Sequence, residues 1–189
     1  MSTQASSRSL SVSATTRARI SRPRAGLFEQ FIPIELPRIL LGYGPVPAVV
    51  STTEQSGPWD QPGSSRTVHL ADGSTAREQV TACERPGHFA YRVGEFSGYV
   101  RYLAAEANGE WWFTEAGQGT DVVWIYSFTA RSRPAQLILL PVVKLLWRGF
   151  MRAGMRAFGE LAESEVSAAP TDSCAPAVLL KGVASTRPG

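Results

Sequence analysis

Alternation of apolar and polar residues dominates the middle of the chain. Residues 65–71 and 75–84 both keep a period of two, and Asp72-Gly73 separates them. That period is typical of strands that bury one face. Asp-Gly between two such runs is a strong signal for a tight hairpin. These residues therefore predict two antiparallel strands joined by a short turn.

Further runs of the same kind lie on both sides of this hairpin. One of them contains Asn108-Gly109, which we interpret as a bulge within one long strand rather than as a tight turn. Residues 117–119 are rich in glycine and are expected to close the last hairpin. The remaining expected strands are 13–20, 48–55, 88–96, 99–116 and 122–130.

Two short helical segments are expected after the first strand. Pro23 suits the first turn of a helix, on which Leu27, Phe28 and Phe31 share one side. Prolines then interrupt this helix, and a second helical turn is expected at residues 37–41.

One long helix is expected at residues 134–163, with Pro141 kinking its first turns. Its large apolar side chains share one side, which we expect to pack on the sheet. The opposite side carries a cation at every fourth position, at Lys144, Arg148, Arg152 and Arg156. We interpret this cationic stripe as a solvated face, and the alternative is contact with anionic lipid or with a carrier protein.

The order of these elements predicts an α+β fold. A strongly curved antiparallel sheet of about seven strands would wrap around the long C-terminal helix, and the two short helices after the first strand would plug one end. One helix rarely fills such a concavity, so a hollow is expected between the helix and the sheet. Glycine, proline and aromatic residues gather in two loops, at 42–47 and 56–63, which we expect at the mouth of this hollow.

Composition fits a single globular domain, since 43% of the residues are hydrophobic and 19% are charged. We expect a disordered N-terminal arm at residues 1–12, a domain at 13–163 and a disordered tail at 164–189. The net charge is +3, and arginines of the N-terminal region supply much of it, so no nucleic-acid partner is expected. The longest apolar run, residues 137–147, is too short to cross a bilayer.

Recognisable cofactor and metal motifs are missing from the sequence. It contains no GxGxxG, GxxxxGK or HExxH pattern, so no cofactor is expected. The two histidines, His69 and His88, have no third ligand at a recognisable spacing, so no metal site is expected. The two cysteines, Cys83 and Cys174, form no CxxC pair, which favours a reducing, cytoplasmic location.

Glu78 is the strongest candidate for proton-transfer chemistry. It shares a strand face with Ala76, Val80 and Ala82, where burial would raise its pKa and suit it to act as a general acid or base. The alternative is a position at the rim of the sheet, where Glu78 would pair with an arginine of a neighbouring strand, at Arg66, Arg77 or Arg92.

Aromatic residues supply the candidate binding surface. Trp124, Tyr126 and Phe128 alternate along one strand and therefore share a face. If that face points into the hollow, it gives an apolar lining with a phenol that can hydrogen-bond a ligand, and Tyr91 would add a second phenol. Otherwise Val123 and Ile125 face the hollow and the aromatic side chains pack outside.

The order of elements and several local sequences resemble the START-like, or SRPBCC, superfamily with its helix-grip fold, and within it the polyketide cyclase/dehydrase and lipid-transport group. The resemblance covers about residues 13–160. Its carriers are GYGP in the first loop, GPWDQPG in the second, RTVHLADGS followed by Glu78, FAYRV, GEWWF, GTDVVWIYSF and LLWRGFM. The superfamily holds lipid carriers, receptors and cyclases, so the resemblance implies a fold more firmly than a function.

Two functions are therefore expected as alternatives. The first is binding of a hydrophobic, lipid- or polyketide-like molecule by a carrier, with Tyr43 and Trp59 as a lid and Trp147 among the lining residues. The second is a cyclase or dehydratase in which Glu78 and a tyrosine, Tyr126 or Tyr91, move a proton. A weaker third alternative is a structural protein that acts through its tails. Peripheral contact with a membrane fits either of the first two, and the oligomeric state stays open.

Overall fold

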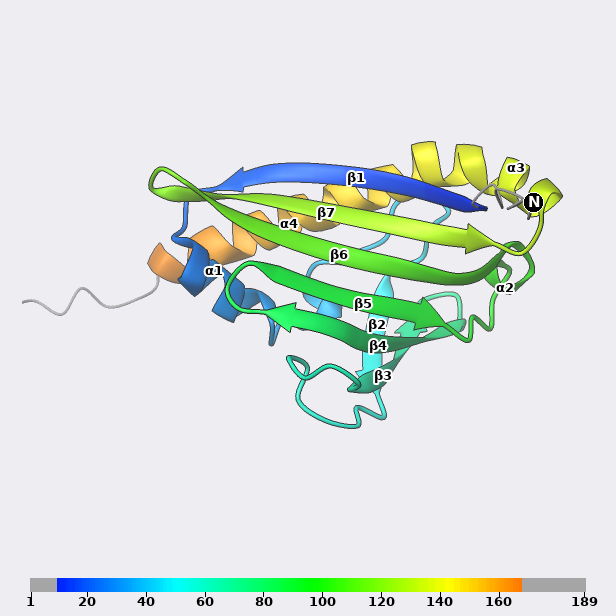
Figure 1. The fold of residues 1–189 in the computed structure, drawn as a ribbon, viewed down its shortest axis with the longest axis horizontal. Coiled ribbons are helices and arrows are strands. Elements are labelled where there is room, and N and C mark those ends of the chain that lie inside the picture. Colours follow the sequence, from blue (N-terminus) through cyan, green and yellow to red (C-terminus); the bar gives the residue numbers. More distant parts are fainter. Residues whose placement is uncertain (1–9, 168–189) are drawn as a thin grey trace, which may run out of the picture.

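The computed structural model describes residues 10–167, which form one seven-stranded antiparallel sheet and a set of helices (Figure 1). The spatial order of the strands is β1-β7-β6-β5-β4-β3-β2. Each strand from β3 to β7 lies beside its neighbours in sequence, and β1 joins the sheet at β7. The strands are β1 (Ser11–Ile20), β2 (Val49–Thr53), β3 (Ser65–Leu70), β4 (Thr75–Glu84), β5 (His88–Gly94), β6 (Ala104–Ala116) and β7 (Gly119–Ala130).

The hairpin between β3 and β4 is the one that the alternation predicted. Gly73 has a φ of 81°, which an L side chain rarely adopts. The Asp72 carboxylate accepts a hydrogen bond from the backbone N–H of Ser74 at 2.9 Å. The turn chemistry and the strand pattern therefore agree.

Two short helices follow β1 and cover one end of the sheet, as expected (Figure 1). They are α1 (Arg24–Phe31) and the 3-10 turn η1 (Leu36–Arg38). Phe31 joins α1 to the core, since its ring centroid lies 4.7 Å from that of Trp111 and 5.6 Å from that of Phe158. A further short helix, α2 (Val100–Leu103), precedes β6 where the sequence predicted strand.

The C-terminal helix has three parts, α3 (Arg133–Pro141), the π-helical segment η2 (Val142–Trp147) and α4 (Arg148–Ser167). Ser132 caps its start by accepting a hydrogen bond from the backbone N–H of Ala135 at 3.3 Å. The π-helical turn begins directly after Pro141, which has no backbone N–H and crowds the preceding turn. The sequence predicted a disturbance at this proline, and the structure shows a widened helix there.

The helix runs behind the sheet along β1 (Figure 1) and buries one side against it. Val143, Met151 and Phe158 are almost completely covered. The cationic stripe of Lys144, Arg148, Arg152 and Arg156 stays on the exposed side. The expected fold class, a curved antiparallel sheet around one long helix, is confirmed.

The expected bulge at Asn108-Gly109 is wrong. Both residues pair regularly, Gly109 with Tyr91 of β5 and with Tyr126 of β7. The irregularity of β6 lies nearer its start, between Ala104 and Glu106. A bulge leaves an extra residue unpaired, and both residues here have a regular partner on each neighbouring strand.

The boundaries of the described domain differ slightly from those expected. β1 begins at Ser11 and α4 ends at Ser167, whereas we expected a domain at 13–163. Most of the expected arm (1–12) and tail (164–189), with Cys174, lies outside the described residues. Between residues 10 and 167, no helix combines the length and apolar character that a bilayer crossing requires. The cytoplasmic location stays a prediction.

Candidate functional site

The larger of two neighbouring pockets lies between the concave face of the sheet and the long helix. Its volume is about 360 Å³. Most of its wall is aliphatic, with side chains from the sheet and the helix that include Val68, Ala76, Val93, Leu139 and Val143. A wall of this composition favours an apolar occupant over water.

An aromatic wall closes one side of the larger pocket. Trp124, Tyr126 and Phe128 of β7 are buried and line it, so this face points inward, as one of the two alternatives predicted. Trp147 joins them from the helix, with its ring centroid 4.8 Å from Tyr126 and 5.1 Å from Phe128. The structure therefore brings together five of the predicted site residues, counting Tyr91, which lines the same pocket.

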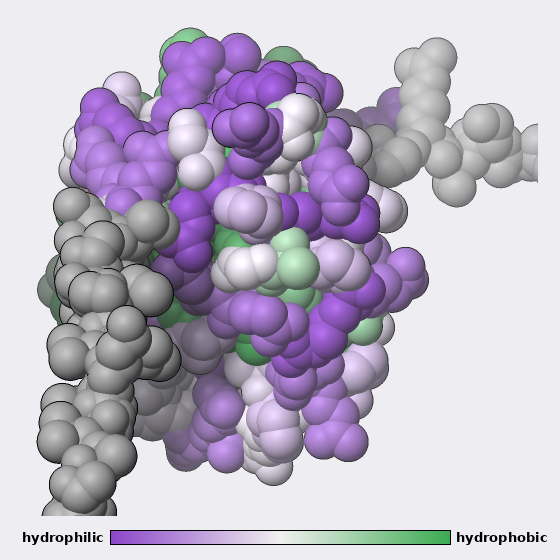
Figure 2. All heavy atoms as spheres, turned by 90° about the vertical axis from the view of Figure 1, so that its left-hand side faces the viewer, coloured by the Kyte–Doolittle hydropathy of each residue, from purple (hydrophilic) through white to green (hydrophobic). Residues whose placement is uncertain are grey.

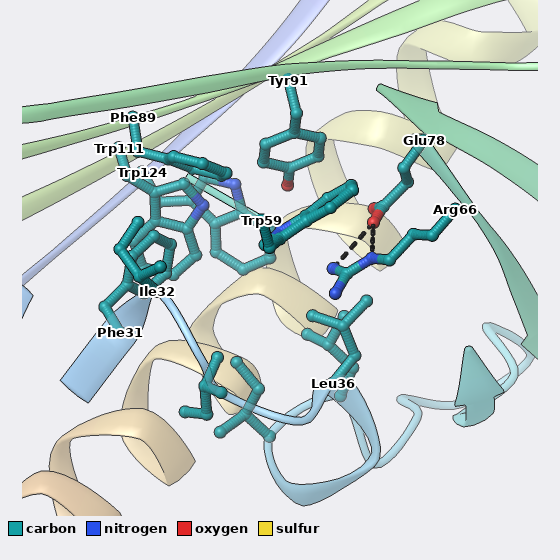
Figure 3. Close-up of a pocket in the computed structure, with 13 residues that line it drawn as sticks. Phe31, Ile32, Leu36, Trp59, Arg66, Glu78, Phe89, Tyr91, Trp111 and Trp124 are labelled. Atoms are coloured by element: carbon teal, nitrogen blue, oxygen red, sulfur yellow. Dashed lines mark hydrogen bonds and ion pairs between the residues drawn. The ribbon is translucent and has the colours of Figure 1, made fainter. Parts of the chain in front are cut away.

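The smaller pocket, about 40 Å³ in volume, adjoins the larger one and is shown in Figure 3. Glu78, Tyr91 and Trp124 line both pockets. Trp59 and Arg66 belong to the smaller one. The candidate acid and one candidate phenol therefore stand at the junction between a roomy apolar space and a narrow one that the Arg66 guanidinium borders.

Glu78 forms a buried ion pair with Arg66. The two residues are directly opposite each other on β4 and β3, and their exposed fractions are 8% and 6%. Arg66 Nε donates a hydrogen bond to Glu78 Oε2 at 2.9 Å, and Nη2 lies 2.9 Å from the same oxygen as an ion pair (Figure 3). Within residues 10–167, Arg66 is the single hydrogen-bond partner of this carboxylate. Its second oxygen is thus free to meet a ligand.

Burial raises the pKa of the Glu78 carboxyl, and the charge and hydrogen bonds of Arg66 offset only part of that rise. The two sequence alternatives for Glu78 were a desolvated position and a pairing with an arginine at the rim. The structure combines the desolvation of the first with the arginine of the second. Carboxyl groups with a pKa shifted by burial are frequent at functional sites.

The tyrosines of the site remain protonated donors. Burial, followed by the charge of Glu78, raises the pKa of Tyr91. Burial, followed by Tyr91 and Glu78, raises the pKa of Tyr126. Figure 3 shows the Tyr91 hydroxyl pointing into the space that Trp59 and Glu78 border. Within the described residues, neither phenol hydrogen-bonds to Glu78. The carboxyl and the hydroxyls expected to transfer a proton therefore line the same pocket without a direct hydrogen bond.

Trp59 covers the ion pair. Its ring lies over the Arg66 guanidinium, with 3.7 Å from the ring centroid to the central carbon. Its centroid also lies 6.5 Å from that of Phe89. Trp59 is half-buried in this position. It therefore closes the smaller pocket rather than standing free as a flap.

Tyr43, the second expected lid residue, lies elsewhere. Its ring packs on the helix over Gly149, so closely that a Cβ at Gly149 would come within 2.7 Å of three of its ring atoms. Tyr43 lines neither pocket. The neighbouring residues Pro45 and Val46 do line the larger pocket. The two loops expected at one mouth thus contribute to different pockets.

Sequence reasoning missed two features of the site. Trp111 stacks on Trp124 with ring centroids 4.5 Å apart, which fixes the back of the smaller pocket. The signal was present, because Trp111 alternates with Gly109 and Phe113 on one face of its strand. The pairing of Arg66 with Glu78 inside the protein had no comparable signal.

Solved structures of similar shape agree with the fold. Norcoclaurine synthase from Thalictrum flavum has a TM-score of 0.63 at 12% identity, over 84% of this chain and 98% of that one. Ara h 8.0201 has a TM-score of 0.58 at 13% identity, over 82% and 99%. The di-domain ARO/CYC BexL from the BE-7585A biosynthetic pathway has 0.57 at 19%, over 85% of this chain and 52% of that one. At these identities the likeness concerns the fold alone.

Sequence comparison adds the family. No curated protein matches the chain significantly. The family model described as polyketide cyclase / dehydrase and lipid transport matches residues 42–163, well over half of the chain. That range contains Arg66, Glu78, Tyr91, Tyr126 and most of the long helix, and the match supports binding of a hydrophobic ligand at family level. The chain therefore belongs to the polyketide cyclase/dehydrase and lipid-transport family.

Proposed function

We propose that this protein binds a hydrophobic small molecule, lipid- or polyketide-like, in the larger pocket, and that it carries or sequesters that molecule. The supporting observation is the apolar wall around about 360 Å³ of space. Small-molecule sites commonly enclose roughly 300–1,000 Å³ and are lined mainly by apolar and aromatic side chains. A few polar groups then set the orientation of the ligand.

Three such polar groups line the larger pocket, those of Glu78, Tyr91 and Tyr126. Tyr126 and Tyr91 offer hydroxyl donors, and Glu78 offers one free carboxylate oxygen beside them. A ligand with an apolar body and an oxygen function at its inner end fits this distribution. A ligand that is apolar throughout would leave these groups without partners, at a cost of about 1–3 kcal/mol for each group that loses its water.

A pocket-filling variant tests the proposal. Ala76 is buried in β4 and lines the larger pocket, so Ala76→Phe should fill part of the space and displace a ligand. Ala105→Phe, at an exposed position, is the matched control. Binding of a fluorescent apolar probe and native mass spectrometry of protein purified from its own host supply the readouts. Equal probe binding by both variants, with no co-purified ligand, would refute binding in this pocket.

A cyclase or dehydratase is the second candidate. It is favoured by the raised pKa of Glu78 at the junction of the pockets, where a carboxyl could exchange a proton with Tyr126 or Tyr91 through the substrate. It ranks second because Arg66 already engages the carboxylate. Tyr126→Phe separates the two candidates. A carrier should keep most of its affinity for a synthetic poly-β-ketone, whereas an enzyme should bind it and lose ring closure or dehydration.

A further inference from the structure

We propose that the end of the molecule formed by α2 and the first half of the long helix docks on an anionic lipid bilayer. The docking surface consists of Tyr99, Tyr102, Leu137, Ile138, Leu140 and Leu145. Its use for ligand exchange rests on the proposed function, but the docking itself does not.

Exposed apolar side chains concentrate on this surface. Eleven large hydrophobic residues are exposed within residues 10–167, and seven of them lie on α3, on η2 or in and next to α2, counting Val100. Leu137 is 72% exposed and Leu145 is 70% exposed. The helices α2 and α3 contact each other, so these side chains form one region. A region of this kind marks an interaction site more often than isolated leucines do.

The opposite end of the molecule has a different character. Figure 2 faces that end and, outside the grey atoms, shows mainly hydrophilic residues with hydrophobic ones in small recessed spots. The exposed apolar residues are therefore not a general property of the surface. They are concentrated at one end of the molecule, at the right-hand side of Figure 1, where α2 and α3 lie.

Charge favours a negatively charged partner. Residues 131–159 contain six arginines or lysines and no aspartate or glutamate. Within the described residues, Arg133, Arg148 and Arg152 form no ion pair, so their guanidinium groups are free for lipid phosphates. Lys144 lies between Leu140 and Leu145 in the sequence, and its ammonium donates a hydrogen bond to the backbone carbonyl of Ser13 at 2.8 Å, so it adds positive charge beside the leucines.

The combination points to a bilayer rather than to a protein. Aliphatic side chains that penetrate, tyrosines at headgroup depth and cations beside them are the features of interfacial helices. Basic residues near an anionic leaflet gain attraction that salt weakens.

The docking surface continues into the larger pocket. Tyr99 and Val100 belong to its lining, as do Leu139, Val142 and Leu146 of the helix. Ile138 and Leu145 are their sequence neighbours and face outward. An apolar ligand could therefore pass between the bilayer and the pocket along an apolar path without crossing water.

Co-sedimentation of the full chain with vesicles tests the docking. We expect binding to phosphatidylcholine vesicles that contain phosphatidylserine, weaker binding without phosphatidylserine, and release by salt. The double variant Leu137→Glu/Leu145→Glu should lose binding, whereas Val50→Glu, at an exposed apolar position of β2, should keep it. Arg148→Gln and Arg152→Gln should each weaken binding roughly fivefold. Arg92→Gln, at an exposed position of β5, should not.

A second measurement covers variants that fold poorly. A Trp introduced by Ile138→Trp should shift its emission to the blue when anionic vesicles are added, while Val50→Trp should not. Failure of the wild-type protein to bind anionic vesicles, or an equal effect of Leu137→Glu/Leu145→Glu and Val50→Glu, would overturn the docking. Ligand binding measured without vesicles is independent, so loss of docking with intact ligand binding contradicts this inference alone.

Discussion

The phenol ring of Tyr91 lies directly across the Cα of Gly109 on the neighbouring strand. The two residues are a cross-strand pair of β5 and β6. A Cβ placed on Gly109 would lie 2.3 Å from Cζ of Tyr91 and 2.5 Å from its hydroxyl oxygen. Because Gly109 has no side chain, the Tyr91 ring can lie against its Cα. This position determines how far the Tyr91 hydroxyl reaches over the pocket.

Gly109→Ala should push the Tyr91 ring out of its place. Overpacking of this kind costs about 1–3 kcal/mol of the free energy of unfolding, and the altered ring should also change ligand affinity. Gly94→Ala is the control, because nothing lies within 4 Å of a Cβ at Gly94 of β5. Chemical denaturation gives the stability. In a Tyr91→Ala background, Gly109→Ala should cost much less stability, and equal effects at both glycines in the wild-type background would contradict this packing.

A second tyrosine and glycine pair allows a parallel experiment in the helix. Gly149→Ala should displace the Tyr43 ring, because its Cβ would meet a ring carbon at 2.2 Å. Gly159→Ala should raise stability, by up to about 1 kcal/mol, because alanine favours helix and the nearest atom is 3.8 Å away. Thermal unfolding measures both. If Tyr43 controls access to a pocket, Gly149→Ala should also speed release of a bound probe, and an unchanged release rate would remove Tyr43 from that role.

Removing one partner of the ion pair between Arg66 and Glu78 should lower the free energy of unfolding. Glu78→Leu leaves the Arg66 guanidinium buried without a counter-charge, and losses of about 3–5 kcal/mol are typical. The double variant Arg66→Met/Glu78→Leu should recover much of this loss, because neither charge is then buried. Equilibrium denaturation of the two single variants and the double variant gives the coupling. A double variant that is as unstable as the sum of the single ones would show that the pair is not the cause.

Stability should fall as the pH rises through the titration of Glu78. Burial raises the pKa of this carboxyl in the folded protein, while in the unfolded chain it returns to about 4.3. The folded state therefore holds the proton to a higher pH than the unfolded state does. The contribution to stability is complete below about 4.3 and is lost as the pH passes the raised folded value.

Two measurements check this titration. Between pH of about 4.3 and the raised pKa of Glu78, the free energy of unfolding should fall with rising pH in the wild type. This part of the pH dependence should be missing in Arg66→Met/Glu78→Leu. The carboxyl carbon of Glu78, followed by NMR, should titrate with a midpoint above about 4.3. A midpoint at or below this value would mean that Arg66 outweighs burial.

Trp59→Ala should open the smaller pocket while the fold persists. The stack on Arg66 contributes about 0.5–2 kcal/mol, and its loss should admit water to the ion pair and speed ligand exchange. Trp112→Ala is the control, since Trp112 is exposed and lines neither pocket. A stability loss above about 3 kcal/mol, typical of core tryptophans, would instead make Trp59 part of the core.

Local signals allowed much of the fold to be predicted. β4 has the bounds that its alternation and the preceding Asp72-Gly73 turn predicted. The long helix was predicted from the helical spacing of its apolar residues, and the burial of these residues confirms it. Gly109 misled the prediction because its role depends on Tyr91 of another strand, and the sequence of one strand does not show which ring lies across it.

The candidate site was predicted less completely, because its polar chemistry depends on pairing across the sheet. The inward face of Trp124, Tyr126 and Phe128 follows from one strand and was one of two stated alternatives. The pairing of Glu78 with Arg66 depends on the register between β3 and β4. A shift of that register by one residue would turn one of the two side chains to the other face of the sheet. Tyr43 was placed at a pocket because its loop is there, although its own ring turns to Gly149.

The π-helical turn at Val142–Trp147 also determines which side chains of α4 face the sheet, because it sets the rotation of α4 about the helix axis. Buried residues recur at four-residue steps from Ala135 through Leu139 and Val143, a spacing that would slide around a regular helix of 3.6 residues per turn. The wide turn absorbs that drift. Deleting one residue there would rotate α4 by about 100° relative to α3. Arg152 and Arg156 would then turn to the buried positions that Met151 and Met155 occupy, so one wide turn allows the same helix to expose apolar residues in α3 and to expose its cations in α4.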